Sequence, residues 1–433
     1  MKFLIHCKSP ETGEKEVWHF DNATNRIRNP HGRLVDFWNQ AKFEGIREAG
    51  GALRPAFSAA TPTKKSNRLR SLKIQLGLNC NYHCAYCSQA EHRQGKQRFP
   101  SRQDIDQFLA ELDRQGIQLR DDGRIEFWGG EPLVYWKALE YLIPKMREKF
   151  SKDVSFSMIS NGSLLTREKV DQLVKWRVSL TISHDGPGFP LRDDKNPLDD
   201  PEMKGIWGYC MEQMKANKLG FSFNVVLSPM SYDVRTVRNY FAEHFSPEAR
   251  FGFEGIVNYH SDLNKAYHFN EEKIKTLQQS IFTELVTRWN DPAWQSLQGN
   301  VVRILEYLVF AVNSKKIYCH CDMADEQVLA VSLDGVCLSC HNCDSKHYSI
   351  GTLKNYPAVA NDKFTHWSLR PNCKDCFCLS ACSGACPYLS PHEHEVNCLN
   401  ERIYYGAFFA VAWFLLTERV IERIEPEQGD GLS

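Results

Sequence analysis

The stretch that decides the fold is a short loop that reads Cys80-Asn81-Tyr82-His83-Cys84-Ala85-Tyr86-Cys87. Its three cysteines have the spacing C-x3-C-x2-C, and the apolar run 72–78 that precedes them predicts a strand. A loop that leaves a strand can wrap three thiolates around one face of a four-iron cluster, so that the fourth iron stays open to a small molecule. Taken alone, the triplet is also compatible with a zinc site or with disulfides.

Composition places the chain among ordinary globular proteins. It has 433 residues, of which 42% are hydrophobic and 24% are charged, enough for two or three domains. The 53 basic and 53 acidic residues give a net charge of zero, which argues against a broad nucleic-acid-binding surface. The first six residues lack the apolar core of a signal peptide, and the apolar run 404–416 is too short to span a bilayer. We therefore expect a cytoplasmic protein without a membrane segment, and a buried helix over 404–416.

The sixteen cysteines are concentrated in two places. Three belong to the loop above, eleven fall between Cys319 and Cys398, and only Cys7 and Cys210 lie apart. A secreted scaffold held by so many disulfides would usually carry a signal peptide. In a reducing cytoplasm such groups of cysteines more often ligate metal.

Residues 67–316 alternate between strand and helix patterns. The predicted strands are 72–78, 124–128, 154–159, 178–183, 221–227 and 250–257, and the predicted helices are 102–115, 134–150, 167–176, 201–218, 233–244 and 271–289. Such alternation favours parallel strands joined by right-handed crossovers, and six units match a partial (β/α)6, TIM-like barrel of the α/β class. Chemistry in such barrels lies at the carboxyl ends of the strands, where the cysteine loop also falls.

The two ends of the chain lie outside this pattern. Residues 1–66 predict a small α+β segment with a hairpin (2–7 and 16–20), a third strand (25–28), a helix (35–48) and a linker (54–67). This segment is either a cap on the main domain or a sheet whose open edge receives a peptide as an added strand. Residues 401–433 are expected to form a C-terminal helix and tail.

Three polar motifs follow the next predicted strands in turn. They are Gly129-Gly130-Glu131-Pro132, Ser160-Asn161-Gly162 and Ser183-His184-Asp185-Gly186-Pro187. Two glycines let a ligand approach the backbone, a glutamate can accept hydrogen bonds from an ammonium group, and Ser and Asn suit ribose hydroxyls. Each motif alone usually marks only a turn, but their order after the cysteine loop points to one site.

This combination resembles the radical S-adenosylmethionine (SAM) superfamily, whose cysteine spacing and Gly-Gly-Glu-Pro motif the chain matches letter for letter. The resemblance implies that SAM chelates the open iron and is cleaved by one electron to a 5′-deoxyadenosyl radical, which abstracts a substrate hydrogen. It assigns the cluster to Cys80, Cys84 and Cys87. It assigns SAM binding to Tyr86, Gly129, Gly130, Glu131, Ser160, Asn161 and Ser183. Asp185 and Arg192 are further candidates.

Residues 317–400 resemble the SPASM extension of a subset of these enzymes, which binds two auxiliary four-iron clusters. The resemblance assigns Cys340 and Cys386 to the nearer cluster, with one or both of Cys319 and Cys321. It assigns Cys373, Cys376, Cys382 and Cys398 to the farther cluster. Cys337, Cys343 and Cys378 lie outside the family pattern, which leaves the ligands of the nearer cluster open. Paired zinc ribbons are the alternative.

Known members with this extension mostly act on polypeptides. We therefore predict an enzyme that abstracts a hydrogen from a ribosomally made precursor peptide and installs a C–C, thioether or ether crosslink or a related oxidation. The predicted partners are this peptide and an electron donor such as flavodoxin or ferredoxin. The alternative is formylglycine formation as in anaerobic sulfatase maturases, although His341 stands where those enzymes place an Asp.

The catalytic acid or base is not assigned. His184, His341 and Tyr259 fall near the predicted mouth of the barrel, where each is more often structural. Two other classes stay open at this stage, a non-catalytic iron–sulfur or zinc protein and a nucleic-acid-modifying enzyme, which would need a basic groove.

Overall fold

The computed structural model describes residues 1–38, 46, 61–92, 98–258 and 268–427. Its largest element is a nine-stranded sheet with the strand order β10-β9-β8-β7-β6-β5-β11-β12-β13. The six strands of the predicted barrel are β5 (Arg68–Gln75), β6 (Gln118–Trp128), β7 (Ser155–Ser160), β8 (Val178–Ser183), β9 (Phe221–Leu227) and β10 (Phe251–Ile256). They are all parallel, and the sheet curves without closing, as expected for a partial barrel.

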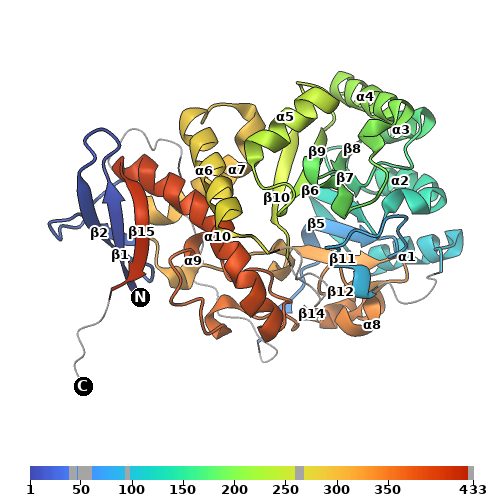
Figure 1. Ribbon diagram of the computed structural model, residues 1–433. Helices are drawn as coiled ribbons and strands as arrows, with labels where there is room; N and C mark the ends of the chain where they lie inside the picture. Colours follow the sequence, from blue (N-terminus) through green and yellow to red (C-terminus); the bar gives the residue numbers. More distant parts are fainter. Residues whose placement is uncertain (39–45, 47–60, 93–97, 259–267, 428–433) are drawn as a thin grey trace.

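Helices cover the outer face of this sheet (Figure 1). They are α1 (Arg102–Arg114), α2 (Trp136–Lys149), α3 (Arg167–Lys175), α4 (Pro201–Ala216), α5 (Val234–His244) and α6 (Glu271–Thr287), followed by α7 (Gln295–Val309). The first six confirm predicted helices to within a few residues, whereas α7 was not predicted. Ser101 caps α1 with a capping box, and Thr166 and Asp233 cap α3 and α5 through their side chains.

The first two barrel strands differ from the prediction: β5 begins and ends earlier in the sequence, and β6 is longer because it begins earlier. β5 ends at Gln75 because Gly77, at φ +140°, turns the chain against the ring of Tyr135, where any Cβ would overlap that side chain. β6 begins at Gln118, six residues before the predicted start, because Gln118 and Leu119 pair with the start of β5. The charged residues that follow Leu119 hid this part of the strand from the hydrophobic pattern.

The cysteine-rich region continues the same sheet. β11 (Val328–Ser332) pairs in parallel with β5, and β12 (Val336–Leu338) and β13 (Ser349–Thr352) extend it antiparallel. The short helices α8 (Ser345–Tyr348) and α9 (Leu379–Cys382) follow, and β14 (Ala360–Asn361) pairs with β4 (Thr63–Lys64). β5 is therefore an interior strand, and the cysteine-rich region is joined directly to the barrel sheet.

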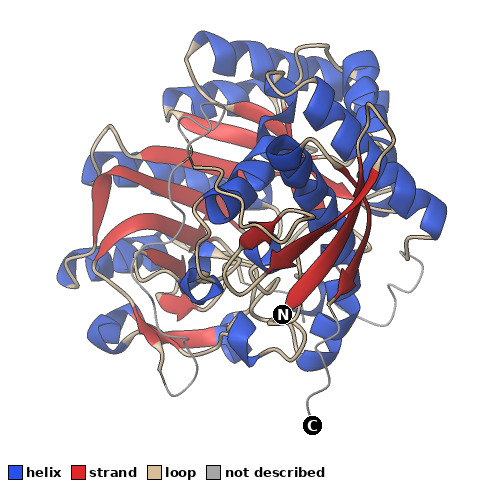
Figure 2. Cartoon of the chain, turned by 90° about the vertical axis from the view of Figure 1, so that its left-hand side faces the viewer, coloured by secondary structure: helices blue, strands red, loops and turns tan. Residues whose placement is uncertain are grey.

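A separate four-stranded sheet joins the two ends of the chain (Figure 2). Its order is β15 (Val420–Pro426), β1 (Lys2–Lys8), β2 (Lys15–Asp21) and β3 (Arg26–Arg28). The predicted hairpin and third strand are present, but the C-terminal tail forms β15 and occupies the β1 side of the sheet. The expected helix over 35–48 is not found in its described residues 35–38 and 46. Its other residues, and residues 54–60 of the linker, lie outside the described residues.

The long helix α10 (Pro391–Thr417) runs from the cysteine-rich region to the small sheet (Figure 1). Its apolar stretch is buried, with Phe408, Phe409 and Trp413 fully enclosed, as predicted for 404–416. Across the residues that the structure describes, no helix is both long and apolar enough to cross a membrane.

Candidate active site

The cysteine loop is held against the Gly-Gly-Glu-Pro turn by backbone contacts. The N–H of Gly130 donates to the carbonyl of Gly77 at 2.9 Å, and the N–H of Glu131 donates to the carbonyl of Asn79 at 2.9 Å. A Cβ on Gly130 would lie 2.4 Å from the carbonyl oxygens of Leu78 and Asn79, and one on Gly129 would lie 2.7 Å from that of Gly77. The two glycines thus let the chain approach itself, which fixes the start of the cysteine loop.

Glu131 joins the ends of three elements through its buried carboxylate. It is 1% exposed and accepts from the Ser160 hydroxyl at 2.7 Å, the Asn161 N–H at 2.7 Å and the Leu133 N–H at 2.9 Å. Burial raises its pKa, and the three hydrogen bonds oppose that rise. The side-chain amide of Asn161 donates to Asn81 in the cysteine loop at 2.9 Å, so this loop, the Gly-Gly-Glu-Pro turn and the Ser160-Asn161-Gly162 motif share one polar network.

The fourth motif contributes a buried ion pair on the other side of the cysteine loop. Asp185 accepts two hydrogen bonds from Arg192, at 2.8 and 2.9 Å, and also binds the hydroxyl of Tyr86. Although burial lowers the pKa of Arg192, the contact with Asp185 outweighs it and raises that pKa. The Tyr86 side chain is thereby held at its hydroxyl. Ser183 is partly buried at the end of β8, two residues before Asp185 in the sequence.

The three cysteines of the loop lie within electrostatic reach of one another. Burial raises the pKa of the Cys84 thiol to about 12, and Cys87 and Cys80 are among the groups that add to the rise. The N–H of Ala85 donates to the carbonyl of Leu191 at 2.8 Å, which ties the middle of the loop to the Asp185 motif. Three thiols on a loop tied at both sides fit one face of a four-iron cluster.

Of the three candidate acid–base residues, His184 faces away from the mouth. It is fully buried among the rings of Phe189, Tyr240 and other aromatic residues. Its Nδ1 accepts from the Gly186 N–H, so Nε2 carries the proton and donates to Asn196 at 2.9 Å. Burial lowers its pKa to about 4, and the ring is a neutral structural element. Tyr259 lies outside the described residues.

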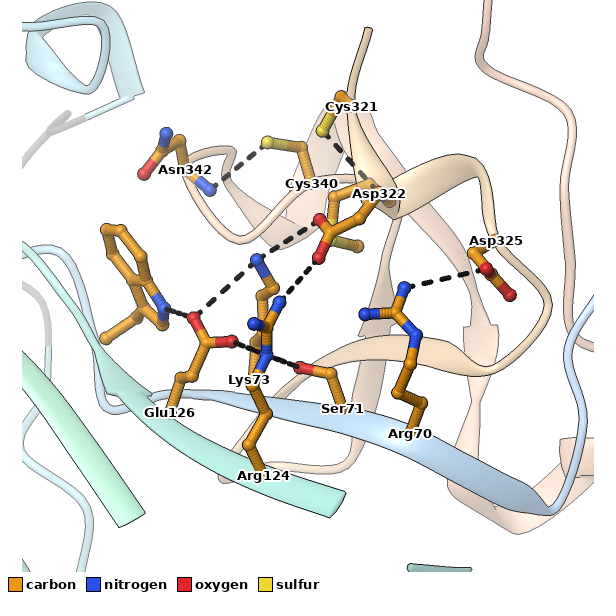
Figure 3. Close-up of polar contacts among 12 residues, drawn as sticks. Arg70, Ser71, Lys73, Arg124, Glu126, Cys321, Asp322, Asp325, Cys340 and Asn342 are labelled. Atoms are coloured by element: carbon orange, nitrogen blue, oxygen red, sulfur yellow. Dashed lines mark hydrogen bonds and ion pairs between the residues drawn. The ribbon is translucent and has the colours of Figure 1, made fainter. Parts of the chain in front are cut away.

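Charged residues converge on the inner face of the barrel, beside the cysteine-rich loops (Figure 3). Lys73 on β5 pairs with Glu126 at 3.6 Å and with Asp322 at 3.3 Å, and Arg124 pairs with the same two carboxylates at 2.7 and 2.9 Å. Although burial raises the pKa of Asp322, Lys73 and Arg124 outweigh it and lower that pKa. These ion pairs link β5 and β6 to Asp322, which directly follows Cys321 in the sequence.

The loop around Cys340 is held over the same face. The side chain of Gln75 donates to the carbonyls of His341 and Cys343 at 2.8 and 2.9 Å. The ring of His341 lies 4.1 Å from that of Trp128 on β6, its Nδ1 has no partner among the described residues, and burial lowers its pKa to about 3. His341 is therefore neutral and packed on the barrel wall.

Cys321, Cys340 and Cys386 form one set of neighbouring thiols. Burial raises the pKa of Cys321 to about 12, with contributions from Cys340 and Cys386. Cys343 is hydrogen-bonded to the Cys340 thiol and so belongs beside this set, and the Cys319 thiol donates to the carbonyl of Cys321 at 2.9 Å. Cys337 is on β12 in the apolar core and lies apart from the set.

A second set surrounds a small cavity at the start of α10. Its lining includes the four cysteines that sequence assigns to the farther cluster, Cys373, Cys376, Cys382 and Cys398, together with His394, Glu401 and Arg402. A hydrogen bond from Cys378 lowers the pKa of the Cys376 thiol to about 7, so the surplus Cys378 stands next to this set. Burial raises the pKa of Glu401 to about 7.

Comparison with known proteins agrees with this geometry. The model of the radical SAM superfamily matches residues 74–195, from the end of β5 through the Asp185 motif. These residues form a radical SAM domain. The radical SAM cyclopropyl synthase TigE of Paramaledivibacter caminithermalis is 21% identical over 384 residues, which cover 82% of this chain and 75% of that protein. A probable GTP 3′,8-cyclase of Methanocaldococcus jannaschii is 27% identical over 167 residues, 37% of this chain and 53% of that protein.

The fold is also found among solved structures. anSMEcpe with bound AdoMet matches with a TM-score of 0.57 and 18% identity over 80% of this chain and 98% of that one. The complex of anSMEcpe with AdoMet and the Cp18Cys peptide matches with a TM-score of 0.56, 18% identity and the same coverage. The chain thus contains a radical SAM domain over residues 74–195, and its fold is shared with these solved structures.

Sequence reasoning missed the residues of the inner face. Lys73, Glu126 and Asp322 were not singled out, because they stand inside or next to apolar runs without a motif. The signal was present as alternation, since Ser71, Lys73 and Gln75 on β5 are polar while the residues between them are apolar. Interior-facing and exterior-facing residues alternate along a barrel strand, so the polar set of β5 faces the lumen.

Proposed function

We propose that this radical SAM enzyme modifies a ribosomally made precursor peptide. A hydrogen is abstracted from the peptide, a crosslink (C–C, thioether or ether) or a related oxidation follows, and the second electron leaves to an auxiliary cluster. The balance is a net two-electron oxidation, in which one hydrogen atom goes to the 5′-deoxyadenosyl radical and one electron and one proton leave the peptide. The proposed compartment is the cytoplasm, and the proposed electron donor is a flavodoxin or ferredoxin.

The observation that carries this proposal is the contact between the two cysteine loops at the mouth of the barrel. Gln89 donates to Asn342 at 3.3 Å, and His92 pairs with Asp344 at 2.7 Å. The polar inner face lies below both loops. A peptide segment in the lumen would thus have the SAM site on one side and the set of Cys321, Cys340 and Cys386 on the other.

The residues present fit the groups that this chemistry needs. When bound, SAM and the first cluster supply the radical, and the auxiliary clusters supply an electron acceptor. Cys80, Cys84 and Cys87 would hold the first cluster, and the buried Glu131 would accept hydrogen bonds from the SAM ammonium group in place of one of its present donors. Tyr86, Ser160, Asn161 and Ser183 would line the nucleoside side.

The two C-terminal thiol sets suit clusters better than zinc. Within the described part of the chain, no three His, Cys, Asp or Glu side chains converge closely enough to hold a single metal ion. Thiols that each bind a different iron of a cluster stand farther apart than thiols that share one zinc. We therefore assign Cys340 and Cys386, with Cys319 or Cys321, to the nearer cluster, and Cys373, Cys376, Cys382 and Cys398 to the farther one.

The names of two similar proteins support a peptide-modifying reaction. TigE is a cyclopropyl synthase, and anSMEcpe has been solved with a bound peptide. Carbon–carbon bond formation on a peptide is thus the version of the proposal with the most support. Formylglycine formation has less support, because the position after Cys340, where sulfatase maturases have an Asp, is occupied by His341. The His341 ring packs on Trp128.

The test is anaerobic incubation of the iron-loaded enzyme with SAM, dithionite and the short peptide encoded beside its gene. We expect 5′-deoxyadenosine and a peptide lighter by two hydrogens, and a carbonyl-reactive hydrazide should not label the product. Cys84→Ala should abolish both products, whereas Cys210→Ala, at a buried cysteine remote from every set, should retain them. Abundant 5′-deoxyadenosine with an unchanged peptide would contradict the substrate, and hydrazide labelling would favour formylglycine.

A further inference from the structure

A groove outside the barrel runs along the free edge of the small sheet. It has a volume of about 860 Å³ and is lined by five consecutive residues of β15, Val420 to Ile424, together with α6 and α10. Side chains of a strand alternate between its two faces, so five consecutive lining residues mean that the groove follows the edge of the strand. Figure 1 shows β15 on the side of the sheet that faces these two helices.

The backbone of β15 offers unused hydrogen-bonding groups to this groove. The N–H of Glu427 donates to the carbonyl of Lys2 at 2.9 Å, which places Glu427, Glu425 and Arg423 in hydrogen-bonded pairs with β1. By alternation, the N–H and carbonyl of Ile424 point away from β1, and no other strand of the described chain pairs with this edge. Pro426, the next outward position, has no N–H to leave unpaired.

The lining of the groove combines an apolar floor with positive charge. Ile274, Phe282, Phe377, Ala407 and Ala410 supply apolar surface. Most charged residues of the lining are already engaged: Arg235 pairs with Glu284, Arg423 pairs with Glu425, Glu422 pairs with Lys8 and Lys15, and Asp233 caps α5. Lys275 and Arg402 have no acidic partner in the described chain, so the uncompensated charge of the groove is positive.

The groove also borders the farther thiol set. Phe377 stands between Cys376 and Cys378 in the sequence, and Arg402 lines both the groove and the small cavity with Cys373, Cys376, Cys382 and Cys398. A molecule in the groove would therefore lie next to this set, on the outside of the protein and away from the barrel lumen.

We propose that the groove binds an acidic, extended segment of the peptide substrate as a fifth strand on β15. This proposal rests on the proposed function, since it assumes that the substrate is a peptide. Main-chain bonds to the edge of a strand bind an extended peptide, while alternate side chains enter the apolar floor and acidic ones meet Lys275 and Arg402. A groove of about 860 Å³ suits an extended peptide better than a globular electron donor, whose interface would bury on the order of several hundred Å² on each partner.

The test uses defined probes and the full, iron-loaded chain. Three fluorescein-labelled twelve-residue peptides are compared by anisotropy: alternating Glu-Val, alternating Lys-Val, and the Glu-Val peptide with every second amide N-methylated. We expect saturable binding of the Glu-Val peptide, at least tenfold weaker binding of the other two, and weakening by added salt. Ile424→Pro removes the outward N–H without breaking the ladder to β1, and it should weaken binding at least tenfold.

A second variant keeps the test decisive if Ile424→Pro disturbs the sheet. Lys275→Glu lies on the exposed surface of α6 and should weaken the Glu-Val peptide severalfold, whereas Lys152→Glu, an exposed charge reversal elsewhere, should not. No binding, or binding unaffected by N-methylation, would overturn the proposal. Binding of flavodoxin in place of the peptide, or a dimer broken by Lys275→Glu, would assign the groove to another occupant and also overturn it.

Failure of this proposal is distinguishable from failure of the proposed function. The binding assay needs no turnover, and SAM cleavage under dithionite needs no groove. An enzyme that modifies its peptide without binding the Glu-Val probe refutes the groove alone. A protein that binds the probe but never alters a peptide refutes the proposed function alone.

Discussion

The two faces of the barrel strands differ sharply although they alternate along the same residues. On β5 and β6 the outward side chains Leu72, Ile74, Ile125 and Phe127 are fully buried against helices. The inward side chains between them include Lys73 and Glu126, and Lys73 pairs with both Glu126 and Asp322. The outer face stabilises the fold through apolar burial, while the inner face carries charge at the proposed substrate site. Substitutions at neighbouring positions of one strand should therefore have different effects: those on the outer face should lower stability, and those on the inner face should mainly lower activity.

The largest expected effect is on the outer face. Phe127→Ala should lower the free energy of unfolding by about 3–5 kcal/mol, because it removes a fully buried ring and leaves a cavity. Its inner-face counterpart Ser157→Ala should change that energy by less than about 0.5 kcal/mol. Thermal unfolding of the iron-loaded proteins measures both, and equal stability of the two variants would contradict the division of the faces.

The inner face should show a smaller loss of stability and a larger loss of activity. Lys73→Met removes the cation that pairs with Glu126 and Asp322, and it should lower the free energy of unfolding by about 2 kcal/mol. The loss is smaller than for breaking an isolated buried ion pair, because Arg124 still pairs with both carboxylates. Peptide modification should fall at least tenfold. Arg70→Met is the matched control on the same strand, since its contact with Asp325 at 3.5 Å is more exposed and worth under about 1 kcal/mol. A Lys73→Met enzyme with wild-type turnover would contradict a role for the network.

A third prediction concerns pH and the outward residue His184. Its pKa is about 4 in the folded protein and about 6.5 unfolded, so the unfolded state binds the proton more readily. Its contribution is complete above pH 6.5 and is lost as the pH falls toward 4, by about 1 kcal/mol between pH 8 and pH 6. Melting curves at the two pH values should show a smaller difference for His184→Gln than for wild type. The exposed His347→Gln should behave as wild type, and an unchanged difference in His184→Gln would show that this ring is not buried and neutral.

The smallest expected change is the loss of one lumen hydroxyl. Ser222 on β9 lies 3.2 Å from the hydroxyl of Thr181 on β8. Ser222→Ala should alter the free energy of unfolding by less than about 0.5 kcal/mol. It should raise the KM for the peptide severalfold with kcat unchanged, because the lost contact stabilises the bound ground state and the transition state equally. Steady-state kinetics measure this, with the surface variant Ser246→Ala as control. A fall in kcat alone would place the hydroxyl in the reaction instead.

The sequence predicted the elements whose signal is local. All six predicted helices were found to within two residues at each end, because caps such as Ser101 and Thr166 mark their first turns. The cysteine loop and Gly-Gly-Glu-Pro motif were also found, although the glycines Gly129 and Gly130 prove to allow a close approach of the chain to itself rather than of a ligand alone.

What the sequence hid depends on contacts between distant segments. The pairing of β15 with β1 joins residues more than 400 positions apart, and nothing in the tail alone indicates that partner. The pairing of β11 with β5 likewise joins the cysteine-rich region to the barrel. Lys73 could not be linked to Asp322 until that pairing brought them together, although alternation already placed Lys73 inside the barrel.

The most direct test of the central claim follows one hydrogen. The peptide encoded beside the gene is made with deuterium at its β-carbons and incubated with enzyme, SAM and dithionite, and the 5′-deoxyadenosine is weighed by mass spectrometry. The account predicts deuterium in the 5′-deoxyadenosine, together with loss of deuterium from the modified peptide. Unlabelled 5′-deoxyadenosine beside an intact deuterated peptide would contradict it.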